Sequence, residues 1–226
     1  MKHIGIVDVT TVGACLCANE IVARAMAQNK EGSHPEFSLH SLPFNLYKDA
    51  VLAKDIQQLA ELVLTSINKL KASGAEFVII PSNTPHYAID RILSVSPLPV
   101  LSILDLVVEQ CANAGYEKVA TLGTAFTMES GLYDQHLRAK GIEPVLAGET
   151  LRKDIDSFIM EEIIPSKVSQ ASLAHIIQGI QEIDCDAVIL GCTELPEVLN
   201  TENMGLPGID STRLLAHKAL AYALVD

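Results

Sequence analysis

The sequence has 226 residues, of which 49% are apolar, and a formal net charge of −12. This length and apolar content suit one large domain or two small ones, and they argue against a disordered chain. The acidic balance argues against nucleic-acid binding, because phosphate neutralisation needs clustered Lys and Arg, and against binding to anionic membranes. An anionic substrate would therefore be held by local hydrogen-bond donors.

The cysteines and the first residues bear on the cellular compartment. Five cysteines occur at irregular spacings, and no pair has the Cys-x-x-Cys spacing of a structural zinc site. The opening MKHIGIVDV predicts a strand and lacks the apolar run of a secretion signal, and no apolar stretch is long enough to span a membrane. We therefore expect free thiols, no metal and a cytoplasmic location.

Short apolar runs alternate with longer amphipathic runs along the chain. Segments with apolar residues at helical spacing include residues 56–70 and 173–183. Between such segments, four runs rich in Val and Ile predict strands buried on both faces, at residues 4–7, 77–80, 119–122 and 187–190. The alternation predicts an α/β fold with mostly parallel sheets flanked by helices.

The two halves of the chain are similar in pattern. Residues 77–82 compare with 187–192, and residues 2–11 compare with 118–127. This duplication predicts two similar Rossmann-like lobes with the active site in a cleft between them, although any two α/β halves share some likeness. The predicted lobes are residues 1–105 plus 210–226, whose last helix at 212–224 packs back on the first lobe, and residues 106–209.

Four predicted strands end in small polar residues, which is where ligands gather in α/β sheets. The duplication makes Ser82 and Cys192 equivalent, so the two side chains would face one bound molecule from opposite sides. A racemase needs this arrangement, because one group removes a proton from a carbon and another returns a proton from the other face. A small cysteine packed at a strand end remains the alternative interpretation of Cys192.

Two segments resemble motifs of the aspartate/glutamate racemase family. Ser82-Asn83-Thr84-Pro85-His86 is similar to the family's Cys-Asn-Thr-x-His segment, and Gly191-Cys192-Thr193-Glu194 is similar to its second cysteine motif, in the form typical of the aspartate branch. The resemblance implies a cofactor-independent amino acid racemase that is often a homodimer. It implies that the Cys192 thiolate moves the α-proton of aspartate or glutamate without pyridoxal phosphate or metal. The helix start predicted at Leu195-Pro196 would lower the pKa of Cys192.

Ser82 departs from the family pattern, which usually has Cys in this place. A hydroxyl is far less acidic than a thiol and needs a neighbouring base, for which His86 and Asp8 are candidates. Three interpretations stay open: a slow or direction-biased racemase, a one-thiol decarboxylase or isomerase of a dicarboxylate, and a Ser that replaces a native Cys. A catalytically impaired amino-acid-binding protein is a further alternative. Ser82 and Asp8 could instead cap the helices that follow them.

The remaining candidates bind substrate or support the thiol. Donors for the substrate carboxylates are expected at Asn83, Thr84, Thr124, Thr127 and Thr193, although each Thr could be an ordinary helix cap. The family resemblance implies a basic residue for the second carboxylate, and Lys48 and Lys167 are the candidates. Glu194 either tunes Cys192 or complements a helix dipole. His86 is the histidine best placed to titrate usefully, although a lone His after a strand is more often structural.

Overall fold

The computed structural model describes residues 1–28 and 33–225. The chain divides into two compact units, one formed by residues 1–106 with 212–226 and the other by residues 107–211. The division falls within helix α5 (Ile103–Ala114) and at the start of helix α11 (Ser211–Leu224). Over the described residues, none of the helices combines the length and the apolar character that crossing a bilayer requires.

The first unit is built on a parallel sheet of four strands in the order β2-β1-β3-β4. All three pairings in this sheet are parallel, and Ile6 of β1 lies between Leu39 of β2 and Ile79 of β3. The central strands β1 and β3 are buried along their whole length. The bounds of the strands are β1 Ile4–Asp8, β2 Phe37–Ser41, β3 Phe77–Ile79 and β4 Val100–Leu101.

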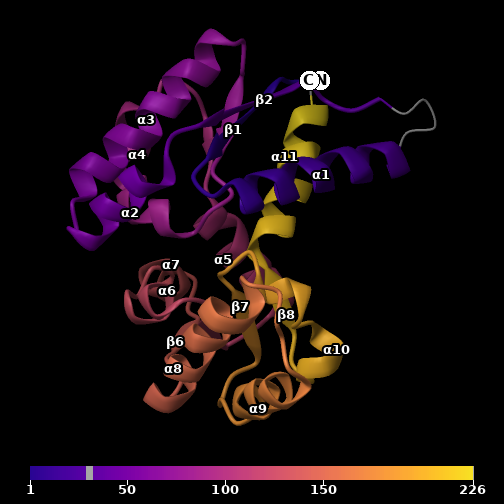
Figure 1. The fold of residues 1–226 in the computed structure, drawn as a ribbon. Coiled ribbons are helices and arrows are strands. Elements are labelled where there is room, and N and C mark those ends of the chain that lie inside the picture. Colours follow the sequence, from indigo (N-terminus) through magenta and orange to yellow (C-terminus); the bar gives the residue numbers. More distant parts are fainter. Residues whose placement is uncertain (29–32, 226) are drawn as a thin grey trace. The chain divides into compact units, whose positions relative to one another are not determined.

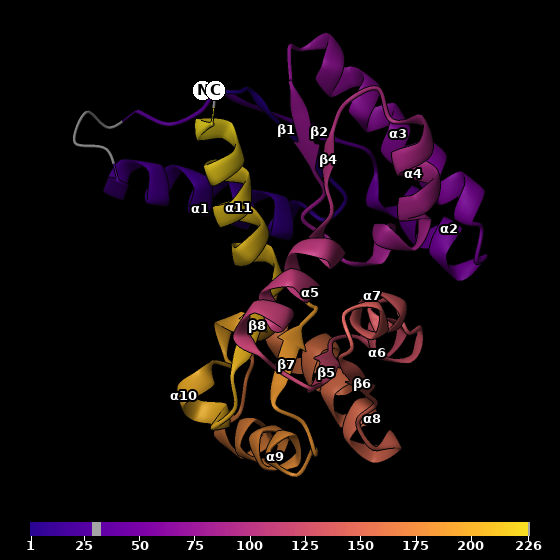
Figure 2. The same cartoon turned by 180° about the vertical axis from the view of Figure 1, so that it is seen from behind.

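Helices cover both faces of this sheet, and Figures 1 and 2 show α2, α3 and α4 on one side with α1 and α11 on the other. Helix α3 begins where the Asp55 side chain accepts a hydrogen bond from the Gln58 N–H. Its apolar stripe joins a buried cluster with Val7, Val78 and Ile80. The bounds are α1 Thr11–Gln28, α2 Phe44–Leu52, α3 Ile56–Ala72, the 3₁₀ helix η1 Thr84–Ala88 and α4 Ile89–Val95.

The C-terminal helix α11 returns to the first unit, as its sequence predicts. Tyr222 of α11 packs edge-on against Phe77 of β3 with ring centroids 4.8 Å apart. The Lys2 N–H donates to the Ala223 carbonyl at 2.8 Å, so the two ends of the chain lie side by side (Figure 1). His217 of α11 contacts Glu20 of α1 at 2.7 Å. These contacts join the last helix to elements at the start of the chain.

The second unit repeats the topology of the first. Its parallel sheet has the order β6-β5-β7-β8, which matches β2-β1-β3-β4 strand for strand. The strand bounds are β5 Lys118–Leu122, β6 Glu143–Val145, β7 Ala187–Leu190 and β8 Gly208–Asp210. The helices are α6 Ala125–Glu129, α7 Asp134–Ala139, α8 Glu149–Ser157, the π-helix η2 Phe158–Ile163, α9 Gln170–Gln181, the 3₁₀ helix η3 Leu195–Glu197 and α10 Thr201–Met204.

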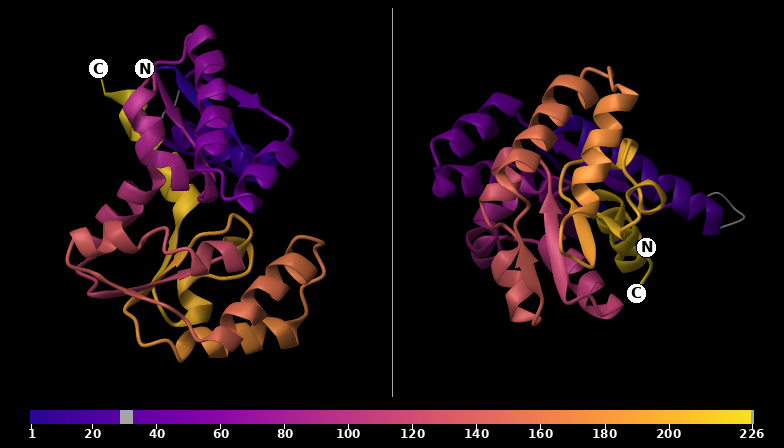
Figure 3. Two further views of the ribbon diagram at one scale, coloured as in Figure 1. Left: turned by 90° about the vertical axis from the view of Figure 1, so that its left-hand side faces the viewer. Right: turned by 90° about the horizontal axis from the view of Figure 1, so that it is seen from below.

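The core of the second unit lies between this sheet and the helices α8, η2 and α9. Figure 3 shows α8 and α9 side by side, and Ile155, Phe158 and Ile176 from these elements pack with Ala120 of β5 and Val188 of β7. The predicted α/β class with two similar lobes of parallel sheet is confirmed.

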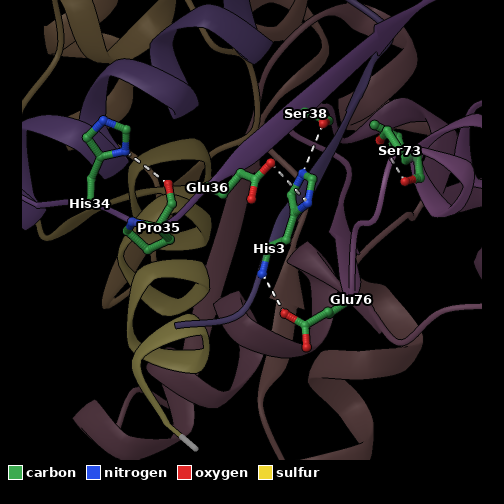
Figure 4. Close-up of polar contacts among 8 residues, drawn as sticks. His3, His34, Pro35, Glu36, Ser38, Ser73 and Glu76 are labelled. Atoms are coloured by element: carbon green, nitrogen blue, oxygen red, sulfur yellow. Dashed lines mark hydrogen bonds and ion pairs between the residues drawn. The ribbon is translucent and has the colours of Figure 1, made fainter.

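Equivalent polar contacts fix the two sheets at the amino ends of their strands. The Glu76 carboxylate, just before β3, accepts a hydrogen bond from the His3 N–H at 2.7 Å. Asp186, just before β7, accepts from the N–H groups of Glu117 and Lys118 at 2.7 and 2.8 Å. Figure 4 shows Glu76 with the His3 side chain, whose Nε2 lies 2.9 Å from the Ser38 hydroxyl. These contacts lie at the amino ends of the strands. The predicted site residues lie at the opposite, carboxyl ends.

Candidate active site

The predicted site residues of the first unit follow the ends of β1 and β3. Ser82 is half-buried, and its N–H donates to the Ile80 carbonyl at 2.8 Å in a tight turn after β3. Asn83 is buried at the start of η1 and makes no side-chain cap bond there, while Thr84 is half-buried. The capping role considered for Ser82 is wrong for η1, because Asn83 occupies the cap position.

His86 is a buried residue that holds this loop in place. Its Nδ1 contacts the Ser82 carbonyl at 2.9 Å, and its Nε2 accepts a hydrogen bond from the Ile103 N–H at 3.3 Å. Because Nε2 accepts, Nδ1 carries the proton and donates to the carbonyl. Both ring nitrogens thus bind backbone groups and tie the Ser82 loop to the start of α5. A proton relay from the Ser82 hydroxyl through His86 would have to break one of these bonds.

Asp8 ends β1 and presents a buried carboxylate. Its Oδ2 accepts a hydrogen bond from the Thr11 hydroxyl at 3.0 Å, whereas Oδ1 is buried and has no hydrogen-bond partner among the described residues. The Asp8 charge reaches Tyr47, whose pKa is raised mainly by burial and further by this carboxylate, against the lowering effect of a hydrogen bond to Ser66. Asp8 therefore has one buried oxygen able to accept a further hydrogen bond.

The predicted thiol of the second unit follows β7 in a closely packed turn. The Gly191 N–H donates to the Leu122 carbonyl at 2.8 Å, which continues the pairing of β7 with β5. A Cβ at position 191 would lie 3.1 Å from both the Leu122 oxygen and the Thr127 methyl carbon. A glycine at 191 thus lets the chain turn tightly and present Cys192 at the carboxyl end of β7.

Cys192, Thr193 and Glu194 form a hydrogen-bonded cluster. The Cys192 Sγ donates to Glu194 Oε2 at 2.9 Å, and the Thr193 hydroxyl donates to the same oxygen at 2.7 Å. The Cys192 side chain is partly exposed and lies against the apolar core of the unit. Cys192 is thus half-buried, and its thiol donates to a carboxylate.

The expected lowering of the Cys192 pKa is wrong. Burial raises the pKa of the thiol, and the Glu194 carboxylate raises it further by its charge and its hydrogen bond, with a smaller contribution from the Asp156 charge. The helix expected after the motif is only the three-residue 3₁₀ turn η3, which supplies little of the favourable dipole of a longer helix. The surroundings of Cys192 therefore hold its pKa above the ordinary value and favour the thiol over the thiolate.

Thr124 and Thr127 follow the end of β5, the strand that pairs with β7, and Thr127 lies within α6. Thr124 caps α6 by accepting from the Thr127 N–H, and the two hydroxyl oxygens are 3.2 Å apart. Asp156 of α8 accepts from the Ala125 N–H at 2.7 Å and so places a second carboxylate near this loop. Sequence reasoning missed Asp156, because no motif marks it and it lies far along the chain from both threonines.

The basic candidates lie on the surface. Lys48 on α2 and Lys167 between η2 and α9 are both exposed. A third basic residue, Arg152 of α8, already has partners, because it contacts the Ala147 carbonyl and pairs with Glu129 at 3.5 Å. A groove of about 350 Å³ beside α8 and α9, lined by Asp154, Glu162 and His175, contains none of the predicted site residues.

Known proteins resemble this chain over almost its whole length. The family model described as Asp/Glu/Hydantoin racemase matches residues 17–219. The chain belongs to this racemase family. The broad specificity amino-acid racemase RacX of Bacillus subtilis is 25% identical over 193 residues, which cover 84% of this chain and 83% of RacX.

Solved structures of racemase relatives share the fold. A candidate Asp/Glu racemase from Yersinia pestis is 29% identical with a TM-score of 0.92, and the match covers 100% of both chains. An aspartate racemase homologue from Pyrococcus horikoshii is 25% identical with a TM-score of 0.87 over 99% of both chains. The family resemblance found in the sequence is thus confirmed, and membership supports an amino acid racemase activity.

Within this member of the racemase family, the predicted residues fall into one group in each unit. Asp8, Ser82, Asn83, Thr84 and His86 belong to the first unit, and Thr124, Thr127, Cys192, Thr193 and Glu194 to the second. In the second group, hydrogen bonds join Cys192 and Thr193 to Glu194, and Thr124 to Thr127. In the first group, His86 joins the backbone of Ser82.

Proposed function

We propose that this racemase interconverts the enantiomers of a small acidic amino acid, aspartate or glutamate, without a cofactor. The observation that supports this proposal best is the partly exposed Cys192 thiol with a carboxylate acceptor 2.9 Å from its sulfur. A thiolate is the reactive form of cysteine, so a group that can take the thiol proton is what such chemistry requires. Glu194 is that group in this chain.

The proposed reaction begins when Glu194 takes the Cys192 proton and the thiolate removes the α-proton of the L-enantiomer. The carbanion is then protonated on its other face, and Ser82 is the proposed donor there. Asn83, Thr84, Thr124, Thr127 and Thr193 would supply hydrogen bonds to the carboxylates, and Lys48 or Lys167 a charge for the distal one. Donors act locally, which suits an acidic protein with an acidic substrate.

The asymmetry between a thiol and a hydroxyl has a kinetic consequence. A Ser hydroxyl needs a base far more than a thiol does, and His86 is engaged with backbone groups. Asp8 has a buried carboxylate oxygen without a partner among the described residues, which makes it the better candidate base for Ser82. Exchange of the α-proton with solvent should therefore be faster from the enantiomer that Cys192 deprotonates.

Solvent exchange tests the proposal. Proton NMR in deuterated buffer should show loss of the α-proton signal from L-aspartate or L-glutamate with the wild-type protein. Cys192→Ala should abolish this exchange, whereas Cys185→Ala, at another half-buried thiol of the second unit, should leave the exchange unchanged. Ser82→Cys should make exchange of the two enantiomers faster and more equal. Absence of deuterium incorporation from either amino acid would refute the proposal.

One alternative uses the same thiol for one-sided chemistry. Ser82 in place of a second cysteine favours a decarboxylase or isomerase of a dicarboxylate over a two-thiol racemase. Such an enzyme would consume its dicarboxylate and would not exchange the α-proton of an amino acid. A protein that binds aspartate, but neither exchanges its α-proton nor consumes a dicarboxylate, would instead be a catalytically impaired homologue that only binds the amino acid.

We also propose that the protein acts in the cytoplasm as a homodimer. Light scattering at micromolar protein concentration measures the molecular mass directly. A mass near 24 kDa, that of one chain, would contradict the dimer.

A further inference from the structure

The first turn of α6 depends on a hydrogen bond from outside the helix. The first backbone N–H groups of a helix have no partner within it. In α6 the Ala125 N–H donates to Asp156 Oδ1 at 2.7 Å, whereas the Thr127 N–H donates to the Thr124 hydroxyl at 3.5 Å. Hydrogen bonds to a carboxylate are shorter and stronger than those between neutral groups. Asp156 is therefore the stronger anchor of this turn.

Asp156 belongs to a helix that is itself fixed in the core. Ile155 beside it is buried, and α8 continues into η2, where Phe158 joins the same apolar cluster. Helix α6 lies beside α8 in Figures 1 and 2, and at its other end Glu129 pairs with Arg152 of α8 at 3.5 Å. Since α6 has only five residues, it is too short to be stable alone. Helix α8 therefore holds α6 at both ends.

Thr127 connects the position of α6 to the turn that carries the thiol. Thr127 is buried, and its Cγ2 lies 3.1 Å from the places where a Cβ on Gly123 or on Gly191 would stand. Its side chain is thus in close contact with both glycines, which follow β5 and β7. Because Gly191 is bonded directly to Cys192, a shift of Thr127 changes the packing of the turn that presents the sulfur.

The charge of Asp156 also acts on the sulfur. Burial and Glu194 raise the pKa of Cys192 most, and the Asp156 charge adds to the rise. This charge disfavours the thiolate that the proposed reaction needs. The useful contribution of Asp156 to the reaction is therefore its hydrogen bond to α6, and a neutral acceptor of the same shape should replace it.

We propose that Asp156 is a positioning residue, which seats Thr127 against the Cys192 turn by holding the start of α6. It acts through α6 and needs no contact with the substrate. Its effect on turnover rests on the proposed function, in which Thr124 and Thr127 bind a substrate carboxylate. Its effect on the turn does not depend on that function, so the two effects can be tested separately.

Asn and Ala at position 156 separate the hydrogen bond from the charge. Asp156→Asn keeps an oxygen that accepts from the Ala125 N–H, Asp156→Ala removes this oxygen, and both variants lose the charge. The rate at which iodoacetamide modifies Cys192 is measured at neutral pH by mass spectrometry, with the Cys185 peptide as an internal control. Modification should be about fivefold faster in Asp156→Ala than in Asp156→Asn, because loss of the hydrogen bond loosens the turn. Asp156→Ser, whose hydroxyl is too short to reach α6, replaces the alanine variant if that protein does not fold.

A matched control and a double-mutant cycle test whether the effect passes through Thr127. Asp154→Ala removes another carboxylate of α8, which bonds to α9 instead of α6, and should leave the modification of Cys192 unchanged. Thr127→Ser removes the methyl group that meets Gly191, so in this background the Ala and Asn variants of Asp156 should be modified at equal rates. A difference that persists in this background, or equal rates without Thr127→Ser, would overturn the proposal.

Turnover gives a second readout, which a simple loss of folded protein would not move. In deuterium exchange of L-aspartate or L-glutamate, Asp156→Ala should raise KM about tenfold, while Asp156→Asn keeps the wild-type KM, because only Asn holds the threonine hydroxyls in place. A lower kcat at unchanged KM in Asp156→Ala would overturn the positioning role. If the wild type itself exchanges no deuterium, the racemase proposal fails, while the modification rates still decide the role of Asp156.

Discussion

At the scale of single residues, the surroundings of Cys192 determine what the sulfur can do. The sequence motif identifies the thiol, but its protonation state follows from burial and from Glu194, which together raise its pKa. The residue whose charge raises the thiol pKa, Glu194, also accepts the thiol hydrogen bond, with its Oε2 2.9 Å from the sulfur. A group that holds a proton at rest can also receive it during reaction, so the raised pKa fits a catalytic pair.

Gly191 permits this geometry by its lack of a side chain. In Gly191→Ala the new Cβ would meet the Leu122 oxygen and the Thr127 methyl at 3.1 Å, and the turn would have to shift. We expect a loss of about 1–3 kcal/mol in the free energy of unfolding, measured by urea denaturation, and slower deuterium exchange.

Two variants control the Gly191→Ala prediction. Adding Thr127→Ser removes the methyl group and should recover part of the stability, although the contact with the Leu122 oxygen remains. Gly148→Ala places a Cβ where no atom lies within 4 Å, at φ −55°, so it should change stability by less than about 0.5 kcal/mol. Equal losses at positions 191 and 148 would contradict the packing argument.

His86 is the second residue whose role the structure redefines. Replacing it with Ala removes the bonds to the Ser82 carbonyl and the Ile103 N–H and leaves both groups without these partners. We expect the free energy of unfolding to fall by about 2–4 kcal/mol, from the loss of buried hydrogen bonds, as measured in urea. A His86 that relays protons would instead show unchanged stability and an altered pH dependence of exchange.

At the scale of elements, the sequence identified the strands at the centre of each sheet. β1, β3, β5 and β7 are the inner strands of the two sheets, so most of their residues are buried and form mainly apolar runs that single-sequence reasoning can find. The sequence did not reveal the outer strands β2, β4, β6 and β8. Strand β4 has only two residues, β6 contains Pro144, and the residues of β2 differ in exposure. A Leu-Pro segment stands just before each of β4 and β8, and the carbonyls of Pro99 and Pro207 accept hydrogen bonds from the N–H groups of Val78 and Val188.

Asp186 shows how one side chain fixes the start of two strands. Backbone hydrogen bonds from Lys118 and Glu117 hold the pKa of its carboxyl below the usual value. A group with a lowered folded pKa adds stability above its unfolded pKa, about 3.9, and this stability is lost as the pH falls through the folded pKa. Asp186→Asn should therefore be less stable than the wild type at pH 7, with a difference that shrinks below pH 4.

The pH series is measured as urea midpoints from pH 7 down to 2.5. Asp184→Asn is the matched control, because Asp184 is an exposed carboxylate that only pairs with the Lys118 amine at 2.6 Å. Exposed ion pairs contribute little, so this variant should follow the wild type across the series. A difference for Asp186→Asn that is constant from pH 7 to 2.5 would show that its charge does not matter.

At the scale of the whole molecule, the two units differ in whether one continuous segment of the chain forms them. The second unit is one continuous segment, whereas the first needs residues 212–226 from the far end of the chain. Leu215, Ala216, Ala219 and Leu220 of α11 are buried, and Tyr222 packs on Phe77 of β3. Removing α11 therefore exposes one face of the first sheet while the core of the second unit keeps its contacts.

Truncation after Ser211, the last residue of the second unit, tests this dependence. Amide hydrogen exchange should rise toward unprotected rates in β1 and β3, because each fully buried Leu of α11 contributes about 1.5–3 kcal/mol of apolar burial, and should stay slow in β5 and β7. Tyr222→Leu keeps the helix and removes the ring contacts with Phe77 and with the Lys2 amine, so protection should fall slightly in β3 and near the start of β1 and stay unchanged in β5 and β7. Equal loss of protection in both sheets of the truncated chain would show that the two units unfold as one cooperative body, and the discontinuous first unit would then not be the weaker one.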